Sequence, residues 1–158
     1  DILEDGSLDL ADDVLAELDI VVCSLHSKFD LPEEKQTSRL LRAMDNPNFN
    51  VWAHPTGRMV GQRAPVDIDI EQVMQAAVER GCFLEVNSQP ARLDLNDVYC
   101  KLAKEMGLRL AISTDAHATN SLNYIRYGID QARRGWLEAD DVINTRSWRD
   151  LKKLLKRT

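Results

Sequence analysis

The sequence predicts an α/β fold in which a mainly parallel sheet is covered by helices. Apolar runs of strand length alternate with segments whose apolar residues recur at helical spacing. One strand with its helix takes about 25 to 30 residues, which is the size of a βαβ unit. The strand runs are continuously apolar, as is typical of strands buried on both faces of a parallel sheet. No low-complexity linker interrupts this alternation, so the 158 residues predict a single folded unit.

The first half of the chain predicts three strands and two helices. The strands are expected at 1–3, 20–26 and 49–54, and the helices at 10–18 and 32–45. Asp5-Gly6 supplies the turn before the first helix. Pro32 suits the first turn of a helix because its backbone is already fixed, and the acidic pair Glu33-Glu34 favours the helix dipole. Asn46-Pro47-Asn48 ends that helix.

The second half continues the same pattern. Strands are expected at 82–88 and 109–114, and helices at 70–80, 95–106, 121–134, 139–143 and 148–155. Gly81 and Gly107 are placed to end the first two of these helices. Asp94 is a suitable N-cap for the helix that follows it. Ser147 and Asp150 have the spacing of a capping box at the start of the last helix.

Composition excludes several classes of protein. No apolar run approaches the roughly 20 residues of a membrane helix, and the N-terminus has no signal-peptide pattern. We therefore expect a soluble, cytoplasmic protein. Cys23, Cys82 and Cys100 are odd in number and lack a C-x-x-C spacing, so neither a disulfide framework nor a thiolate zinc site is indicated.

The charge balance argues against a broadly cationic surface that binds nucleic acid by itself. The formal net charge is -6, and such a surface would need an excess of lysine and arginine. A local basic rim is still compatible with this balance. Arg58, Arg63 and Arg92 follow predicted strands and could form one.

Polar side chains with metal-binding chemistry gather where the predicted strands end. These residues are His26, His54, Glu85, Asn87, Asp115 and His117. The carboxyl ends of parallel strands meet at one edge of the sheet, where α/β folds collect their chemistry. Asp115 and His117 are two apart at the end of a strand, so both point the same way.

A metal site is one of two interpretations of this pattern. A lone histidine at a strand end is more often a hydrogen-bonded core residue than a ligand, and an aspartate can simply orient a histidine. Here all three histidines of the chain occupy strand ends. Imidazole with carboxylate oxygen suits zinc, manganese or iron, whereas a calcium site would be almost entirely oxygen.

The motifs together resemble the PHP (polymerase and histidinol phosphatase) domain. The matching segments are SLHSKF, AHPTGR, LEVNS, PARLDL and STDAH, which span almost the whole chain. DILEDGSLD and PARLDL look most like the PHP domain at the C-terminus of bacterial family X DNA polymerases. The resemblance implies a distorted (β/α)7 TIM-like barrel that holds up to three divalent metal ions, manganese, zinc or iron. Residues 1–158 would be the C-terminal portion of one such domain.

The resemblance also implies roles for individual residues. Its implied metal ligands are His26, His54, Asp115 and His117. Asp115 and His117 would also take part in catalysis. Glu85 would be a second-layer group that fixes ligands or metal-bound water, with the alternative that Glu85 and Asn87 only cap the end of the sheet.

Phosphate binding is implied on the neighbouring loops. Arg58 would contact phosphate, because a guanidinium fork matches phosphate oxygens. Arg92 and Lys28 are further candidates, with a solvated surface role as the alternative. Asn87 would either bind substrate or support the ligands as Glu85 does.

The family's opening H-x-H motif, its next histidine and a glutamate expected just before Asp1 lie outside this sequence. We therefore expect the isolated segment to be inactive.

The function implied is a metal-dependent phosphoesterase attached to polymerase domains in a longer chain, with 3′ to 5′ exonuclease or 3′-end processing activity on DNA. Two alternatives stay open. A small-molecule phosphatase of the histidinol-phosphatase type would share the ligands and differ in the pocket. A degenerate scaffold would support a neighbouring polymerase without chemistry of its own.

Overall fold

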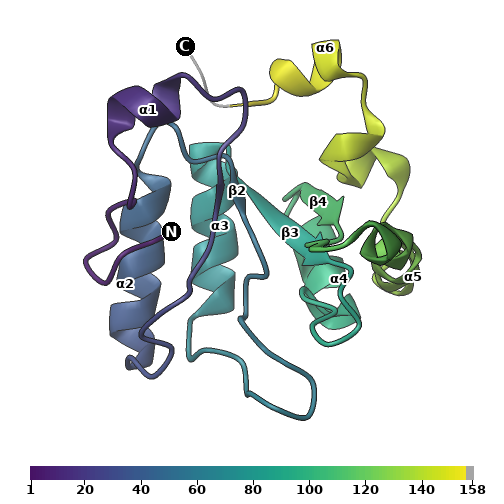
Figure 1. Cartoon of the computed structure of the whole chain (residues 1–158), viewed down its shortest axis with the longest axis horizontal. Coiled ribbons are helices and arrows are strands. Elements are labelled where there is room, and N and C mark those ends of the chain that lie inside the picture. Colours follow the sequence, from purple (N-terminus) through teal and green to yellow (C-terminus); the bar gives the residue numbers. More distant parts are fainter. Residues whose placement is uncertain (156–158) are drawn as a thin grey trace.

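A four-stranded parallel sheet organises the chain in the computed structural model, which describes residues 1–155 (Figure 1). The strands are β1 (Val22–Cys23), β2 (Val51–Trp52), β3 (Phe83–Asn87) and β4 (Leu110–Ser113). They lie side by side in chain order, and every neighbouring pair is parallel. This arrangement confirms the α/β prediction and is consistent with part of a TIM-like barrel.

Helices connect the strands. The α-helices are α1 (Asp12–Ala16), α2 (Glu33–Met44), α3 (Ile70–Arg80), α4 (Asp97–Glu105), α5 (Ile125–Arg134) and α6 (Trp148–Lys152). Short 3-10 helices occupy Thr119–Tyr124, Ala139–Asp141 and Ile143–Thr145. Helices α2 and α3 stand side by side, as Figure 1 shows. No helix within residues 1–155 combines the length and apolar character needed to cross a membrane.

The central strand β3 separates the apolar core from the polar edge of the sheet. Leu84 and Val86 are fully buried and join the main hydrophobic cluster, which also contains Leu40 of α2 and Met74 of α3. Burying each such side chain contributes about 1.5 to 3 kcal/mol. Because successive residues of a strand alternate, Glu85 and Asn87 point to the opposite face. That face carries the candidate site.

Strand β1 departs from the prediction of a strand buried on both faces. Only Val22–Cys23 is regular strand, and Val22 is 56% exposed whereas Cys23 is buried. The reason is that Val22 lies on the face of the sheet that borders the cavity described below, whereas Cys23 points into the main hydrophobic cluster. The expected helix at 10–18 is also shorter, and only Leu15 of it is buried.

The predicted cap of α4 was wrong. Asn96, not Asp94, caps this helix by accepting a hydrogen bond from the Tyr99 backbone N–H at 2.9 Å. Asp94 is fully buried and serves another purpose, described below. The end of α3 at Gly81 was predicted correctly, with a left-handed φ of 65°.

The C-terminal helices also differ from the prediction. The segment expected as one helix over 121–134 is a 3-10 helix followed by α5, and 139–143 lies across two 3-10 turns. Ser147 does cap α6, because its side chain accepts a hydrogen bond from the Asp150 backbone N–H.

Candidate metal and phosphate site

A cavity of about 390 Å³ opens at the carboxyl ends of the strands. Its lining residues are Val22, His26, Ala53, His54, Glu85, Arg92, Ser113, Asp115 and His117. All four strands or the segments directly after them contribute to it. The structure therefore brings together five of the six strand-end residues singled out from the sequence, and Asn87 lies buried directly behind Glu85, to which its side chain is bonded.

His26 and His54 form a pair on one side of this cavity. Their ring centroids are 5.2 Å apart and the rings are tilted by 50°. Burial lowers the pKa of His54 to about 4 and also lowers the pKa of His26, with the charge of Arg92 contributing to both shifts. Both imidazoles are therefore neutral at physiological pH, which is the form that coordinates metals.

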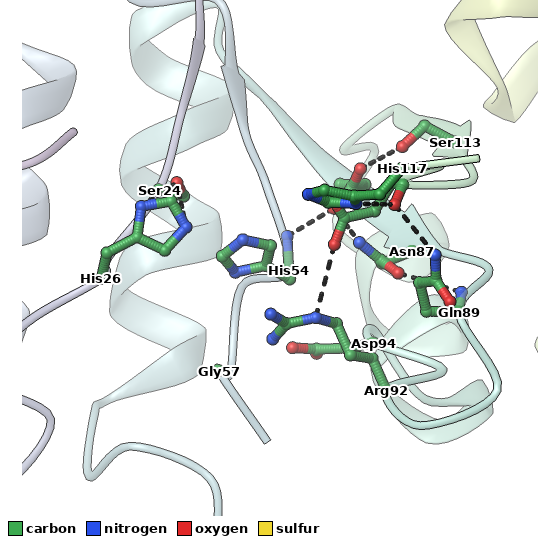
Figure 2. A network of polar contacts seen from close by, with 12 residues as sticks. Ser24, His26, His54, Gly57, Asn87, Gln89, Arg92, Asp94, Ser113 and His117 are labelled. Carbon is green, nitrogen blue, oxygen red and sulfur yellow. Dashed lines mark hydrogen bonds and ion pairs between the residues drawn. The ribbon is translucent and has the colours of Figure 1, made fainter. Parts of the chain in front are cut away.

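The ring of His54 has a nitrogen to spare. Its Nδ1 atom is buried and has no hydrogen-bond partner within residues 1–155. Buried polar nitrogens are nearly always paired, so an unpaired one at the edge of a cavity fits a site that receives a ligand. Figure 2 shows the His54 ring between His26 on one side and Arg92 on the other.

The backbone of His54 is held by Glu85. His54 has a positive φ of 32°, a region that side-chain-bearing residues rarely adopt. Its N–H donates to Oε2 of Glu85 at 2.5 Å across the β2–β3 pair. This bond offsets part of the cost of the backbone conformation and fixes where the imidazole leaves the sheet.

Glu85 is the centre of a buried hydrogen-bond network. It also accepts hydrogen bonds from the Ser113 hydroxyl and from the Asn87 amide at 3.1 Å. Burial raises the pKa of the Glu85 carboxyl, and the hydrogen bonds from Ser113, His54 and Asn87 oppose that rise. The carboxylate therefore accepts hydrogen bonds from three donors, which lie in β3, in β4 and just after β2. We call Glu85 and these three donors the floor of the cavity.

Asp115 and Arg92 face each other on the other side of the cavity. Nε of Arg92 lies 3.5 Å from Oδ2 of Asp115. Asp115 has a positive φ of 49°, and its backbone carbonyl accepts a hydrogen bond from Gln89 at 2.9 Å. Nη1 of Arg92 is buried and has no hydrogen-bond partner among the residues that the structure describes. A guanidinium nitrogen in that state is suited to an anion in the cavity.

His117 sits at the exposed rim. Its side chain is 86% exposed, and Nδ1 lies 2.8 Å from the backbone oxygen of Asp115. The carboxylate of Asp115 is farther away, at 3.9 Å.

Three predicted substrate contacts do not line the cavity. Lys28 forms an ion pair with Glu4 at 3.2 Å. Asn87 is fully buried, where its amide supports Glu85 and its carbonyl oxygen accepts from the Gln89 backbone N–H. The guanidinium of Arg58 donates to the backbone carbonyls of Arg92 and Leu93.

Sequence reasoning missed Asp94 and Thr56 as parts of the site's support. The Asp94 carboxylate accepts hydrogen bonds from the Thr56 N–H at 2.9 Å and the Thr56 hydroxyl at 3.0 Å. Burial raises the pKa of Asp94 to about 6, although the bonds from Thr56 and the charge of Arg58 lower it. The only signal in the sequence was that Thr56 and Asp94 lie on two loops that follow strand-end motifs.

The arrangement fits a metal in part. Neutral imidazole nitrogens and a carboxylate border one cavity, which is a donor set that suits zinc, manganese or iron. Within residues 1–155, however, no three His, Cys, Asp or Glu side chains are grouped closely enough to hold an ion as they stand. Metal binding therefore requires side-chain rotation or a further ligand.

Comparisons with known proteins found several similar sequences. The chain is 46% identical over 157 residues to the DNA polymerase/3′-5′ exonuclease PolX of Bacillus subtilis, covering 99% of the chain and 28% of that protein. It is 32% identical over 151 residues to a probable phosphatase of Thermoanaerobacter sp. (strain X514), covering 90% of the chain and 59% of that protein. A probable phosphatase of Caldanaerobacter subterraneus is 36% identical over 123 residues, 72% of the chain and 46% of that protein.

The chain thus spans about a quarter to three-fifths of the length of these relatives. No family model matches the sequence. The relatives nevertheless bear out the resemblance carried by the strand-end motifs. The chain is similar to a segment of a family X DNA polymerase and to probable phosphatases, which is consistent with a PHP-like segment.

Proposed function

We propose that this chain is the C-terminal portion of a PHP domain that hydrolyses phosphate esters with the help of divalent metal ions, and that its substrate is the 3′ end of DNA. The observation that carries the proposal is a pair of buried nitrogens at one cavity, Nδ1 of His54 and Nη1 of Arg92, neither of which has a hydrogen-bond partner in the described part of the chain. The first is a ligand for a cation and the second is a donor to an anion. A metal-bound phosphate ester needs both.

The residues that would hold metal are those that border the cavity with nitrogen or carboxylate donors. They are His26, His54, Asp115 and His117. Manganese, zinc or iron in that position would supply a Lewis acid for the phosphoryl oxygens and an activated water.

The protein's own groups have separate tasks in this proposal. Arg92 donates to a non-bridging phosphate oxygen and offsets its charge, since guanidinium and phosphate match in geometry. Glu85 holds the backbone of His54 and the hydroxyl of Ser113, so that the ligand side of the cavity is set before substrate arrives.

DNA 3′ ends are proposed as the substrate because the name of the Bacillus subtilis relative, which is 46% identical, includes a 3′-5′ exonuclease. The chain covers 28% of that protein. We therefore expect polymerase domains in the same longer chain, and they would deliver the DNA end that the acidic chain, with its net charge of -6, is poorly suited to capture alone.

The test uses the intact protein that carries this chain. After chelation, activity on a 3′-labelled oligonucleotide should return with Mn²⁺ or Zn²⁺, and His54→Ala and Asp115→Ala should each lower it by more than about 100-fold. Asp130→Ala, at an exposed position on α5, is the matched control and should keep full activity. Full activity of both site variants would refute the proposal.

A small-molecule phosphatase is the second candidate, and the relatives named as probable phosphatases favour it. Turnover of a phosphorylated amino alcohol by the same preparation, with no release from the DNA end, would replace the first proposal with this one. A preparation that binds no metal and acts on neither substrate would identify a scaffold.

A further inference from the structure

The loop that follows β3 places the Arg92 side chain in the lining of the cavity, and this buried position must be stabilised by other parts of the structure. Nη1 of Arg92 is buried with no hydrogen-bond partner from residues 1–155, and the side chain is only 18% exposed. Leaving such a group unpaired is costly, so an unsupported loop would turn the side chain toward water. The next residue, Leu93, has a positive φ of 45°, which adds to the cost.

A second loop, directly after His54, provides the support. Nε of Arg58 donates to the Arg92 carbonyl at 2.8 Å, and Nη2 of Arg58 donates to the Leu93 carbonyl. Both carbonyls flank the strained part of the Arg92 loop. The guanidinium of Arg58 is therefore directed at main-chain atoms, and Arg58 does not line the cavity.

Other bonds join the same two loops on either side of Arg58. The Thr56 N–H and hydroxyl donate to the buried carboxylate of Asp94. The Val60 N–H donates to the Ala91 carbonyl at 2.7 Å. The Arg58 bonds lie between these two connections, closest in sequence to Arg92 itself.

We propose that Arg58 is a positioning residue that presents Arg92 to the phosphate group of the substrate, and that Arg58 does not contact the substrate. This inference rests on the proposed phosphoesterase function. It differs from the role that the family resemblance implies for Arg58, because the fork that would hold phosphate is already used on two carbonyls.

The two roles predict different effects of substitution. If Arg58 met the phosphate directly, Arg58→Lys would keep much of the charge interaction, and the effects of Arg58 and Arg92 would add. A positioning role requires the fork geometry, which lysine lacks. Loss of Arg58 would then matter only while Arg92 is present, so the two substitutions would not be additive.

The experiment is a double-mutant cycle on the intact protein with inorganic phosphate as the probe. Phosphate affinity is measured directly by calorimetry, with metal present, and separately as competitive inhibition of ester hydrolysis. We expect Arg92→Gln to weaken phosphate binding by about 10-fold or more. Arg58→Gln and Arg58→Lys should each weaken it by nearly as much, and Arg58→Gln should have no further effect in the Arg92→Gln protein.

Arg63→Gln is the matched control. Arg63 lies in the same loop and donates to the Gly57 carbonyl at 2.8 Å, but it stacks on Phe29 rather than contacting the Arg92 loop. It should keep wild-type phosphate affinity. Arg58→Lys keeps the stem and charge of the side chain, so it provides the readout if Arg58→Gln does not fold.

Three outcomes would overturn the inference: additive losses in the double variant, wild-type affinity in Arg58→Gln, or preserved affinity in Arg58→Lys. Kinetics provide an independent check, because losing the presentation of Arg92 should raise KM and lower kcat in the same proportions as Arg92→Gln. Calorimetric phosphate binding by wild-type protein that hydrolyses no ester would reject the proposed function and leave the Arg58 inference testable.

Discussion

The two sides of the candidate site are built in different ways. On the floor, Glu85 is 4% exposed and accepts three hydrogen bonds, from Asn87 of β3, from Ser113 of β4 and from the N–H of the buried His54 just after β2. On the rim, the side chains of His26 and His117 are 52% and 86% exposed; Nδ1 of His26 lies 2.6 Å from Oδ1 of the exposed Asp1, and Nδ1 of His117 lies 2.8 Å from the Asp115 backbone oxygen. The floor is preorganised by the fold, whereas the rim can adjust to whatever it binds.

This difference separates residues expected to contribute to stability from residues whose proposed role is ligand binding alone. A group that accepts several buried donors cannot be removed without leaving those donors unpaired. A solvated group can be removed at almost no cost to folding. The comparison therefore predicts how substitutions in one small cavity divide between effects on unfolding free energy and effects on activity.

Glu85→Ala should have the largest effect on stability. It leaves the His54 N–H, the Ser113 hydroxyl and the Asn87 amide without their acceptor, and we expect a loss of about 4 kcal/mol of unfolding free energy. Urea unfolding followed by the fluorescence of the buried Trp52 measures it. Glu79→Ala, whose side chain is 59% exposed, is the control. Equal stability of the two variants would contradict a stabilising role for the hydrogen bonds that Glu85 accepts.

Asp94 should make the stability of the floor depend on pH. Its pKa is about 6 in the folded protein and near 3.8 when unfolded, so between these values the folded protein binds more protons. Stability is then lost as pH rises from about 4 to 6, by about 3 kcal/mol in total. Asp94→Asn should remove this component of the pH profile. An unchanged fall across the same window in Asp94→Asn would contradict the assignment.

Gly128→Ala should disturb the packing of α5 against β4 and the end of β3. Gly128 is buried in α5, and an added Cβ would lie 2.1 Å from the Ser88 hydroxyl oxygen and 2.7 Å from Cγ2 of Ile112. Overpacking of this kind costs about 2 kcal/mol. Thermal unfolding of Gly128→Ala beside Asp130→Ala, an exposed site on the same helix, measures the difference. A Gly128→Ala protein as stable as the control would contradict this prediction, because it would show that Ser88 and Ile112 can move away from the added methyl group at no cost in stability.

The sequence predicted the parts of this site that depend on local pattern. Alternation of strands and helices placed His26, His54 and Asp115 at strand ends, and parallel pairing then brought those ends together. The support of the site could not be predicted in the same way. Thr56 bonds to Asp94 across 38 positions, and Arg58 turns to carbonyls 34 and 35 positions away. Such contacts exist only once the sheet has formed.

The misplaced cap shows the same limit. Asp94 and Asn96 are both good N-caps by residue type, and local preference gives no reason to choose between them. The choice is made by Thr56, which offers two donors to Asp94 in the interior and leaves Asn96 to cap α4.

His117→Ala should give the smallest effect on stability, within about 0.5 kcal/mol of wild type, because its side chain is largely in solvent and its contact is to the Asp115 backbone oxygen. If the rim does hold metal, the same variant should lose metal affinity and ester hydrolysis. Unfolding and metal titration of one preparation separate the two quantities. A variant that loses stability but keeps metal affinity would contradict this comparison. His117 would then be a structural residue, and the metal ligands would have to come from the floor.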